Sequence, residues 1–248
     1  MGRLDGRIAV VSGAASGMGQ GAALKLAQEG AVIEILDRND ASETLALIRE
    51  AGGAAAASIC DVTDEDQIRA AAQAVEARRG RIDILVNNAG ILSGRKPWHE
   101  LTRAEVDRFL QVNFMGYFLV SQAFYPLLKK SSAGRIINVA SRTYYLANPG
   151  QMAYVASKGA VMGFTRVLSK ELGPENITVN AVAPGMIATE GTLANSPVEA
   201  FDRVMQNQAI RKRGQPRHLA GLIAFLASDE AELITGQFML CDGGGYLL

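Results

Sequence analysis

The strongest constraint on the fold is a regular alternation of short apolar runs with longer segments of helical periodicity. The apolar runs, which are typical of buried strands, occupy residues 7–12, 31–37, 54–60, 82–86, 135–140, 176–183 and 236–240. Helical patterns are predicted at 20–28, 41–51, 64–79, 103–130 with a break around Asn113 and Gly116, 151–172 and 216–227. Because each connection is long enough to hold a helix, we expect a parallel sheet with helices on both faces, the α/β class.

The chain is predicted to form one domain, residues 1–248. Its 248 residues, 48% of them hydrophobic, are enough for one large core. No internal repeat, linker or low-complexity segment divides the sequence. The least regular part, residues 186–213, mixes turn residues with apolar side chains. It is interpreted as a substrate lid, and a surface loop with one short helix is the alternative.

Composition argues against several classes of partner. The 25 basic and 25 acidic residues give a net charge of zero, so we expect no binding to nucleic acid or to anionic membranes. No apolar run is long enough for a membrane span, and no signal peptide is recognised, which favours a cytoplasmic location. Cys60 and Cys241 are expected to be reduced and buried. Neither His99 nor His218 has a ligand partner at a recognisable spacing, so no metal site is predicted.

A glycine-rich turn follows the first apolar run directly. Gly13, Gly17 and Gly19 lie between that run and a helical pattern. Glycine allows backbone to approach a pyrophosphate closely, and the N-terminus of a helix offers free N–H groups and partial positive charge. The turn is therefore a candidate dinucleotide-binding site, and a tight connection without a ligand is the alternative.

The second apolar run ends in an acidic residue, Asp37. A carboxylate at this point is placed to accept hydrogen bonds from an adenosine ribose, and it would repel the 2′-phosphate of NADP. The residue therefore favours NAD. A helix N-cap or a solvated loop acid is the alternative, and the neighbouring Arg38 could stack on adenine or pair with a phosphate.

The fifth apolar run leads to the most reactive combination of side chains in the chain. Ser141 follows this run, and Tyr154 and Lys158 lie four residues apart on the next predicted helix, so they share a face. A cation beside a phenol favours the phenolate and lowers its pKa. Tyr154 is therefore a candidate proton donor, with Ser141 able to bond the same substrate oxygen. A half-exposed Tyr beside a solvated Lys is the alternative.

Taken together, these residues resemble the short-chain dehydrogenase/reductase family over the whole chain. The shared pattern comprises, in order, Gly13-x-x-x-Gly17-x-Gly19, Asp61, Asn87-Asn-Ala-Gly90, Asn113, Ser141, Tyr154-x-x-x-Lys158 and Pro184-Gly185. The resemblance implies a single doubly wound (Rossmann) domain with a seven-stranded parallel sheet in the order 3-2-1-4-5-6-7. It also implies a homotetramer, with one interface at the C-terminal end and another on the helices that start near Arg103 and Gln151.

The resemblance further implies a catalytic set of Asn113, Ser141, Tyr154 and Lys158. Tyr154 would exchange a proton with the substrate oxygen, Ser141 would orient that oxygen, Lys158 would lower the pKa of Tyr154 and hold the nicotinamide ribose, and Asn113 would hold a water. Asp61 would contact adenine, and Asn88 would lie near the adenosine ribose. Ile187 and Thr189 would bind the carboxamide. The expected cofactor contacts are Gly13, Ser16, Gly17, Met18, Gly19, Asp37, Asp61, Val62, Asn88, Tyr154, Lys158, Ile187 and Thr189.

The favoured hypothesis is an oxidoreductase that transfers hydride between NAD(H) and a secondary alcohol or ketone. The substrate is expected to carry an apolar or aryl substituent, because the candidate lining residues are mostly apolar or aromatic. These are Leu92, Trp98, Tyr144, Tyr145, Leu146, Met186, Leu193, Phe201 and Met205. Two alternatives remain. One is a 3-oxoacyl-(acyl carrier protein) reductase, for which Lys129, Lys130, Arg166 and Lys170 could supply a basic patch, and the other is an NAD-binding protein without turnover.

Overall fold

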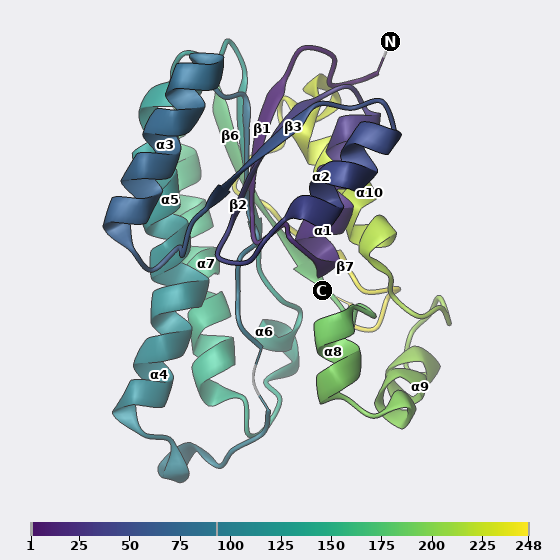
Figure 1. Ribbon diagram of the computed structural model, residues 1–248. Helices are drawn as coiled ribbons and strands as arrows, with labels where there is room; N and C mark the ends of the chain where they lie inside the picture. Colours follow the sequence, from purple (N-terminus) through teal and green to yellow (C-terminus); the bar gives the residue numbers. More distant parts are fainter. Residues whose placement is uncertain (1, 93, 248) are drawn as a thin grey trace.

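A computed structural model describes residues 2–92 and 94–247. Its seven strands form one parallel sheet in the order β3-β2-β1-β4-β5-β6-β7 (Figure 1). The strands are β1 Ile8–Ser12, β2 Val32–Asp37, β3 Ala55–Ile59, β4 Ile84–Asn87, β5 Gly134–Val139, β6 Ile177–Pro184 and β7 Phe238–Cys241. The chain thus has the doubly wound α/β fold that the alternating pattern predicts.

Helices connect the strands and cover both faces of the sheet. The longer ones are α1 Gly17–Gln28, α2 Ser42–Glu50, α3 Glu65–Arg79, α4 Arg103–Leu110, α5 Gly116–Leu128, α7 Met152–Leu172, α9 Val198–Gln206 and α10 Pro216–Ala227. Shorter ones are α6 Thr143–Leu146, α8 Glu190–Asn195 and the single turns η1 Trp98–Glu100, η2 Gln111–Met115, η3 Gly173–Glu175 and η4 Asp229–Ala231. None of the helices described is both long and apolar enough to cross a membrane.

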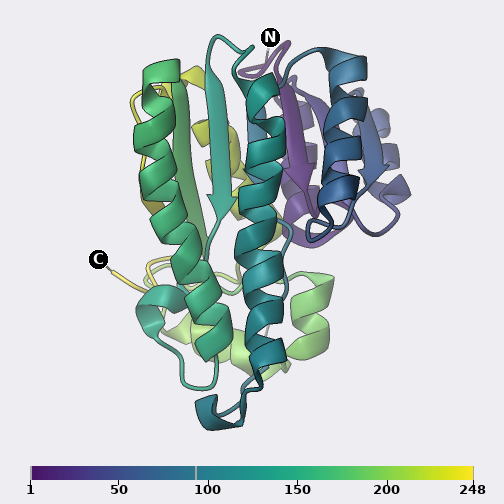
Figure 2. The same ribbon diagram turned by 90° about the vertical axis from the view of Figure 1, so that its left-hand side faces the viewer.

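The core consists of two apolar layers, one on each face of the sheet. Alternate residues of β1 illustrate the division, because Ala9 and Val11 pack toward α1, α2 and α10, whereas Val10 packs toward α3 and α5. Figure 2 shows α5 and α7 running side by side along the second face. Both faces of every central strand are therefore buried, which is why these strands read as continuous apolar runs instead of alternating ones.

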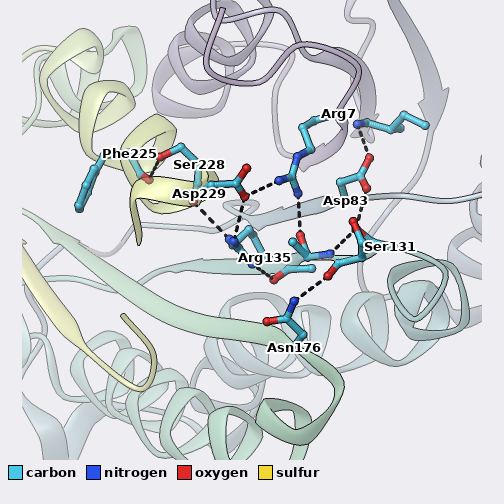
Figure 3. A network of polar contacts seen from close by, with 12 residues as sticks. Arg7, Asp83, Ser131, Arg135, Asn176, Phe225, Ser228 and Asp229 are labelled. Atoms are coloured by element: carbon cyan, nitrogen blue, oxygen red, sulfur yellow. Dashed lines mark hydrogen bonds and ion pairs between the residues drawn. The ribbon is translucent and has the colours of Figure 1, made fainter. Parts of the chain in front are cut away.

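Charged residues hold the amino ends of the central strands together (Figure 3). Arg7 and Arg135 both pair with Asp229, and Arg135 is only 1% exposed. Asp83 accepts hydrogen bonds from the Ile8 backbone N–H at 2.9 Å and from the Ser131 hydroxyl at 2.6 Å. This network connects β1, β4, β5 and η4, and it leaves the opposite, carboxyl edge of the sheet for the loops described next.

Two local features differ from the sequence predictions, the start of the first helix and the burial of Cys241, and the break in the stretch 103–130 agrees with them. The first helix begins at Gly17, inside the glycine-rich turn, instead of at residue 20. The helical stretch 103–130 is divided by the π-helical turn Gln111–Met115, which is where the pattern predicted a break. Cys60 is buried, but Cys241 is only partly buried, because β7 is an edge strand.

Candidate active site

A large cavity lies at the carboxyl ends of the strands, where ligands bind in open α/β sheets. Its volume is about 1010 Å³, enough for a dinucleotide together with a small substrate. The wall is built from the loops that follow β1, β2, β4, β5 and β6, and from parts of α8 and α9. Figure 1 shows α6, α8 and α9 beyond this end of the sheet.

Two glycines of the glycine-rich turn, Gly13 and Gly19, have no room for a side chain. A Cβ at Gly13 would lie 2.7 Å from the Ala89 Cα, and one at Gly19 would lie 2.0 Å from the Gly13 carbonyl oxygen. The Asn88 amide donates to the carbonyls of Ser12 and Gly13 at 3.0 and 2.9 Å, so it fixes the turn to the loop after β4.

Most of the expected cofactor contacts lie on the wall of the cavity, Gly19 being the exception. Gly19 is buried behind the turn and acts through packing. The predicted residues on the wall are Gly13, Ser16, Gly17, Met18, Asp37, Asp61, Val62, Asn88, Tyr154, Lys158, Ile187 and Thr189. They trace a continuous path from the ends of β2 and β3, past β1, to the ends of β5 and β6.

Asp37 is held rigidly at the end of β2. One carboxylate oxygen accepts the Ala15 N–H at 2.9 Å and the other accepts the Asn39 N–H at 2.9 Å. Asp37 is not the N-cap of α2, because that position belongs to Ala41. Since a carboxylate can accept about four hydrogen bonds, Asp37 retains the capacity to bind ribose hydroxyls.

Ser141, Tyr154 and Lys158 meet on one part of the wall, and each is less than a tenth exposed. Ser141 lies just beyond β5, and the other two side chains lie one helical turn apart on α7. The Ser141 hydroxyl oxygen accepts hydrogen bonds from the Thr143 N–H at 3.2 Å and the Thr143 hydroxyl at 2.9 Å, which fixes its position.

Burial dominates the protonation of this group. It raises the pKa of the Tyr154 phenol, and a hydrogen bond with Ser141 offsets part of that rise. It lowers the pKa of Lys158 from 10.5 to about 7. The sequence predicted that Lys158 lowers the pKa of Tyr154, but the principal influence on the phenol in the structure is its own desolvation, which has the opposite sign. The spacing of Tyr154 and Lys158 in the sequence predicts that their side chains are close together, but it does not reveal that folding removes water from the phenol.

Hydrogen bonds to two neighbouring groups fix the position of the Lys158 ammonium group. It donates to the Val139 carbonyl at 2.8 Å and to the Tyr117 hydroxyl at 3.2 Å, and it lies 5.0 Å from the centre of the Tyr117 ring. The Tyr117 hydroxyl in turn donates to Val139 at 3.0 Å. Sequence reasoning did not identify Tyr117, because an aromatic residue on an apolar helix is indistinguishable from a core residue.

Asn113 lies behind the wall, not on it. It is fully buried in the π-helical turn, where its side-chain oxygen accepts the Ile91 N–H at 2.8 Å. Its two side-chain N–H groups donate to the Ile91 carbonyl and the Ser157 hydroxyl, both at 3.1 Å. Ser157 then donates to the Tyr154 carbonyl. Asn113 thus connects the loop after β4 to the helix that carries Tyr154, and its amide N–H groups have no capacity left for a water.

Three of the expected lining residues, Leu92, Leu146 and Met186, lie on the wall. The others do not, namely Trp98, Tyr144, Tyr145, Leu193, Phe201 and Met205. Tyr145 stacks on Tyr246 with ring centres 5.2 Å apart, and Phe201 packs under the Arg213 guanidinium, 5.2 Å from its ring centre. Periodicity identifies the apolar face of a helix but not the direction in which that face points.

The wall is also more polar than the sequence predicted. Residues that sequence reasoning missed are Arg95, Arg142, Thr143, Asn148, Gln151 and Arg203. Arg142 follows Ser141 directly, and this position next to a candidate site residue is the sequence signal that could have identified it. Within residues 2–92 and 94–247, no group of three or more His, Cys, Asp or Glu side chains could hold a metal ion.

Comparisons with known proteins agree with this geometry. Residues 13–245 match the family model adh_short_C2, described as enoyl-(acyl carrier protein) reductase. The chain is 40% identical over 246 residues to a 3-oxoacyl-[acyl-carrier-protein] reductase of Thermotoga maritima, with 98% of each chain covered. It is 37% identical over 248 residues to a cyclopentanol dehydrogenase of Comamonas testosteroni, again with 98% of each covered.

One solved structure is similar to this chain in both fold and sequence. It is a 7α-hydroxysteroid dehydrogenase complexed with NADH and 7-oxo glycochenodeoxycholic acid, which superimposes with a TM-score of 0.93. The two chains are 35% identical, and the match covers 98% of this chain and 95% of that one.

Proposed function

Because the chain belongs to the short-chain dehydrogenase/reductase family, and is therefore an NAD(P)-dependent oxidoreductase of alcohols and ketones, we propose that it transfers hydride between NAD(H) and a secondary alcohol or its ketone. The observation that carries this proposal is that Ser141, Tyr154 and Lys158 line the same cavity as the glycine-rich turn. The nicotinamide supplies or accepts the hydride.

Tyr154 is proposed to exchange the proton. Because burial keeps its pKa above the ordinary value, the hydroxyl is protonated at neutral pH and can donate to a developing alkoxide. Ser141, fixed by Thr143, would orient the same oxygen. Lys158 would place a charge near the phenolate and bind the nicotinamide ribose through the N–H that Val139 and Tyr117 leave free. Asn113 is proposed to position α7 through Ser157.

NAD is proposed as the preferred cofactor. Asp37 has spare acceptor capacity at the end of the cavity formed by β2 and β3, and its carboxylate would repel a 2′-phosphate there. In the solved relative described above, the bound nicotinamide is NADH. Arg38 and Asn39 share this part of the wall.

The substrate is proposed to have an apolar part. Leu92, Leu146, Met186 and Val204 give the wall apolar surface near the catalytic residues. We also propose that residues 186–213 act as the lid of the single domain 1–248, since α9 contributes Arg203 and Val204 to the wall.

A homotetramer is proposed on the family resemblance and on exposed apolar side chains. Phe118 on α5 and Val167 on α7 are 37% and 60% exposed, and Figure 2 shows these helices side by side on the outside of the molecule. Sedimentation equilibrium, which measures molar mass in solution, tests this assembly.

Reduction of 3-oxoacyl-(acyl carrier protein) is the second candidate, supported by the identity to the Thermotoga maritima reductase. It requires a basic surface for an acidic carrier. Of the candidate lysines, however, Lys129 is paired with Glu175 and Lys130 with Glu76, which weakens that surface. Comparing turnover of 3-oxoacyl thioesters with that of simple ketones separates the two candidates.

The proposed chemistry is tested by Tyr154→Phe, which keeps the ring and removes the proton. Turnover of ketones is expected to fall by about 10²- to 10⁴-fold, while the affinity for NADH, followed by its fluorescence, stays close to that of the parent. Tyr144→Phe is the matched control, because Tyr144 is off the wall and 44% exposed. Normal turnover by Tyr154→Phe would refute the mechanism, and tight NADH binding by the parent chain without oxidation by any ketone would favour a non-catalytic role.

A further inference from the structure

Arg142 is a buried cation on the cavity wall with most of its hydrogen-bonding capacity unused. It is 7% exposed and follows Ser141 in the chain. Within the described residues the one hydrogen bond of its side chain runs from Nη1 to the Asp242 carboxylate, at 3.2 Å. A guanidinium has five N–H donors, so four have no partner among the described residues. The proposed proton transfer uses none of them.

The guanidinium is held in a fixed position by its surroundings. Asp242 is itself 5% exposed, and its second oxygen accepts the N–H groups of Gly244 and Gly245 at 3.0 and 3.2 Å. Two glycines leave the room that Arg142 fills. A Cβ at Gly245 would lie 2.3 Å from Nη1, and one at Gly185 would lie 3.6 Å from Cζ. The pair is therefore a preorganised fork and not a mobile surface contact.

Arg142 lies on the substrate side of the cavity, not on the cofactor phosphate side. Its neighbours come from the carboxyl ends of β5, β6 and β7. The glycine-rich turn follows β1, which is two strands from β5 and three from β6 in the sheet. With strands about 4.8 Å apart, the turn is roughly 10 to 15 Å away across the sheet. A ligand that reached both Ser141 and Arg142 would therefore be a substrate.

Among the other charged residues on this side of the wall, the basic ones outnumber the acidic ones. Arg95, from the loop after β4, and Arg203, from α9, also lie on the wall, and Glu190 is the acidic residue that the described part of the wall presents near them. Asp37 and Asp61 lie at the distant adenosine end. Because Asp242 offsets the charge of Arg142 itself, the two other arginines supply the net positive field that attracts an anion.

We propose that Arg142 binds a carboxylate of the substrate, so that the preferred substrates are hydroxy acids and their oxo acids. The proposal rests on the proposed function, because it assigns the class of molecule whose carbonyl Tyr154 and Ser141 bind. A guanidinium fork matches a carboxylate in two parallel hydrogen bonds. Leu92 and Met186 would contact the carbon chain.

The test compares each of a set of short 2-oxo, 3-oxo and 4-oxo acids with its own primary amide. The pair differs in charge and hardly in shape, so the ratio of their kcat/KM values isolates recognition of the carboxylate. In the parent chain the ratio for the best acid is expected to be at least about 10. Arg142→Met should remove most of this preference by lowering kcat/KM for the acid, while kcat/KM for the amide stays within about threefold.

Two further variants keep the test decisive. Arg142→Met leaves the buried Asp242 carboxylate without its positively charged partner, so the double variant Arg142→Met/Asp242→Asn, which removes both charges, is expected to fold and to show the same loss of preference. Arg103→Met removes an equal charge from a side chain that is 93% exposed and off the wall, and it should keep the parent ratio.

The outcomes separate this inference from the proposed function. A parent chain that reduces amides as well as acids, or a double variant that keeps the preference for acids, would overturn the role of Arg142 and leave the proposed function intact. A parent chain that binds NADH and reduces simple ketones, but neither acids nor amides, would overturn the role of Arg142 alone, whereas one that reduces none of the three would overturn both.

Discussion

Burial of Lys158 makes the stability of this chain depend on pH in a way that one substitution can reveal. The pKa of Lys158 falls from 10.5 to about 7 because the folded chain withholds water from the ammonium group. Between these two values the unfolded chain binds more protons than the folded chain, so the free energy of unfolding rises with pH. Stability is therefore lost as pH falls from 10.5 toward 7, and it stays low below 7. The substitution Lys158→Met keeps most of the volume of the side chain and removes its titrating amino group.

The magnitude follows from the two pKa values. Each pH unit in this window changes the free energy of unfolding by about 1.4 kcal/mol. Allowing for partial titration near the ends, the parent chain should gain about 2 to 3 kcal/mol relative to Lys158→Met between about pH 6 and about pH 9. The hydrogen bonds to Val139 and Tyr117 are lost at both pH values, so they cancel in the comparison.

The assay is urea unfolding of both chains, without nicotinamide, at the same protein concentration and at the two pH values. The quantity of interest is the change with pH in the difference between their free energies of unfolding, since every other titrating group contributes alike to both chains. A difference that is the same at both pH values would refute the reasoning, because it would mean that folding does not desolvate Lys158. A parent chain whose free energy of unfolding falls relative to that of Lys158→Met as pH rises would refute it equally.

Two further predictions concern the cofactor end. Asp37→Ser removes the carboxylate that would repel a 2′-phosphate, and it should raise the ratio of NADPH to NADH affinity by at least about tenfold, measured by nucleotide fluorescence; an unchanged ratio would remove Asp37 from cofactor choice. Gly19→Ala, whose Cβ would lie 2.0 Å from a carbonyl oxygen, should cost about 1 to 3 kcal/mol in urea unfolding and weaken NADH binding. Gly221→Ala in α10 meets no atom within 4 Å and should stabilise the chain by about 0.5 to 1 kcal/mol.

The family to which the chain belongs accounts for how much the sequence could predict. The doubly wound sheet and its strand order are confirmed by the structure and by solved relatives. The residues of the cofactor path stayed predictions, but the structure places nearly all of them around one cavity. Asp37 and Tyr154 could be found because each lies at a recognisable point, the end of a strand or one face of a helix.

Side chains away from such points could not be assigned. Phe201 was expected to face substrate and instead packs into the core beneath Arg213. Asn113 was expected to hold a water, but its amide is bonded to the loop after β4 and to Ser157. In both cases the partner is far away in the sequence, so no local pattern reveals it.

The sequence by itself determined the parallel sheet, and it pointed to a candidate site at the carboxyl edge and to Tyr154 as the candidate proton donor, because strand and helix periodicities and short-range spacing are properties of neighbouring residues. Only the tertiary structure decided the sign of the pKa shift of Tyr154, the polarity of the substrate wall and the position of Arg142. These depend on desolvation and on contacts between residues that are distant in the chain, and such contacts form only when the strands and their loops pack together.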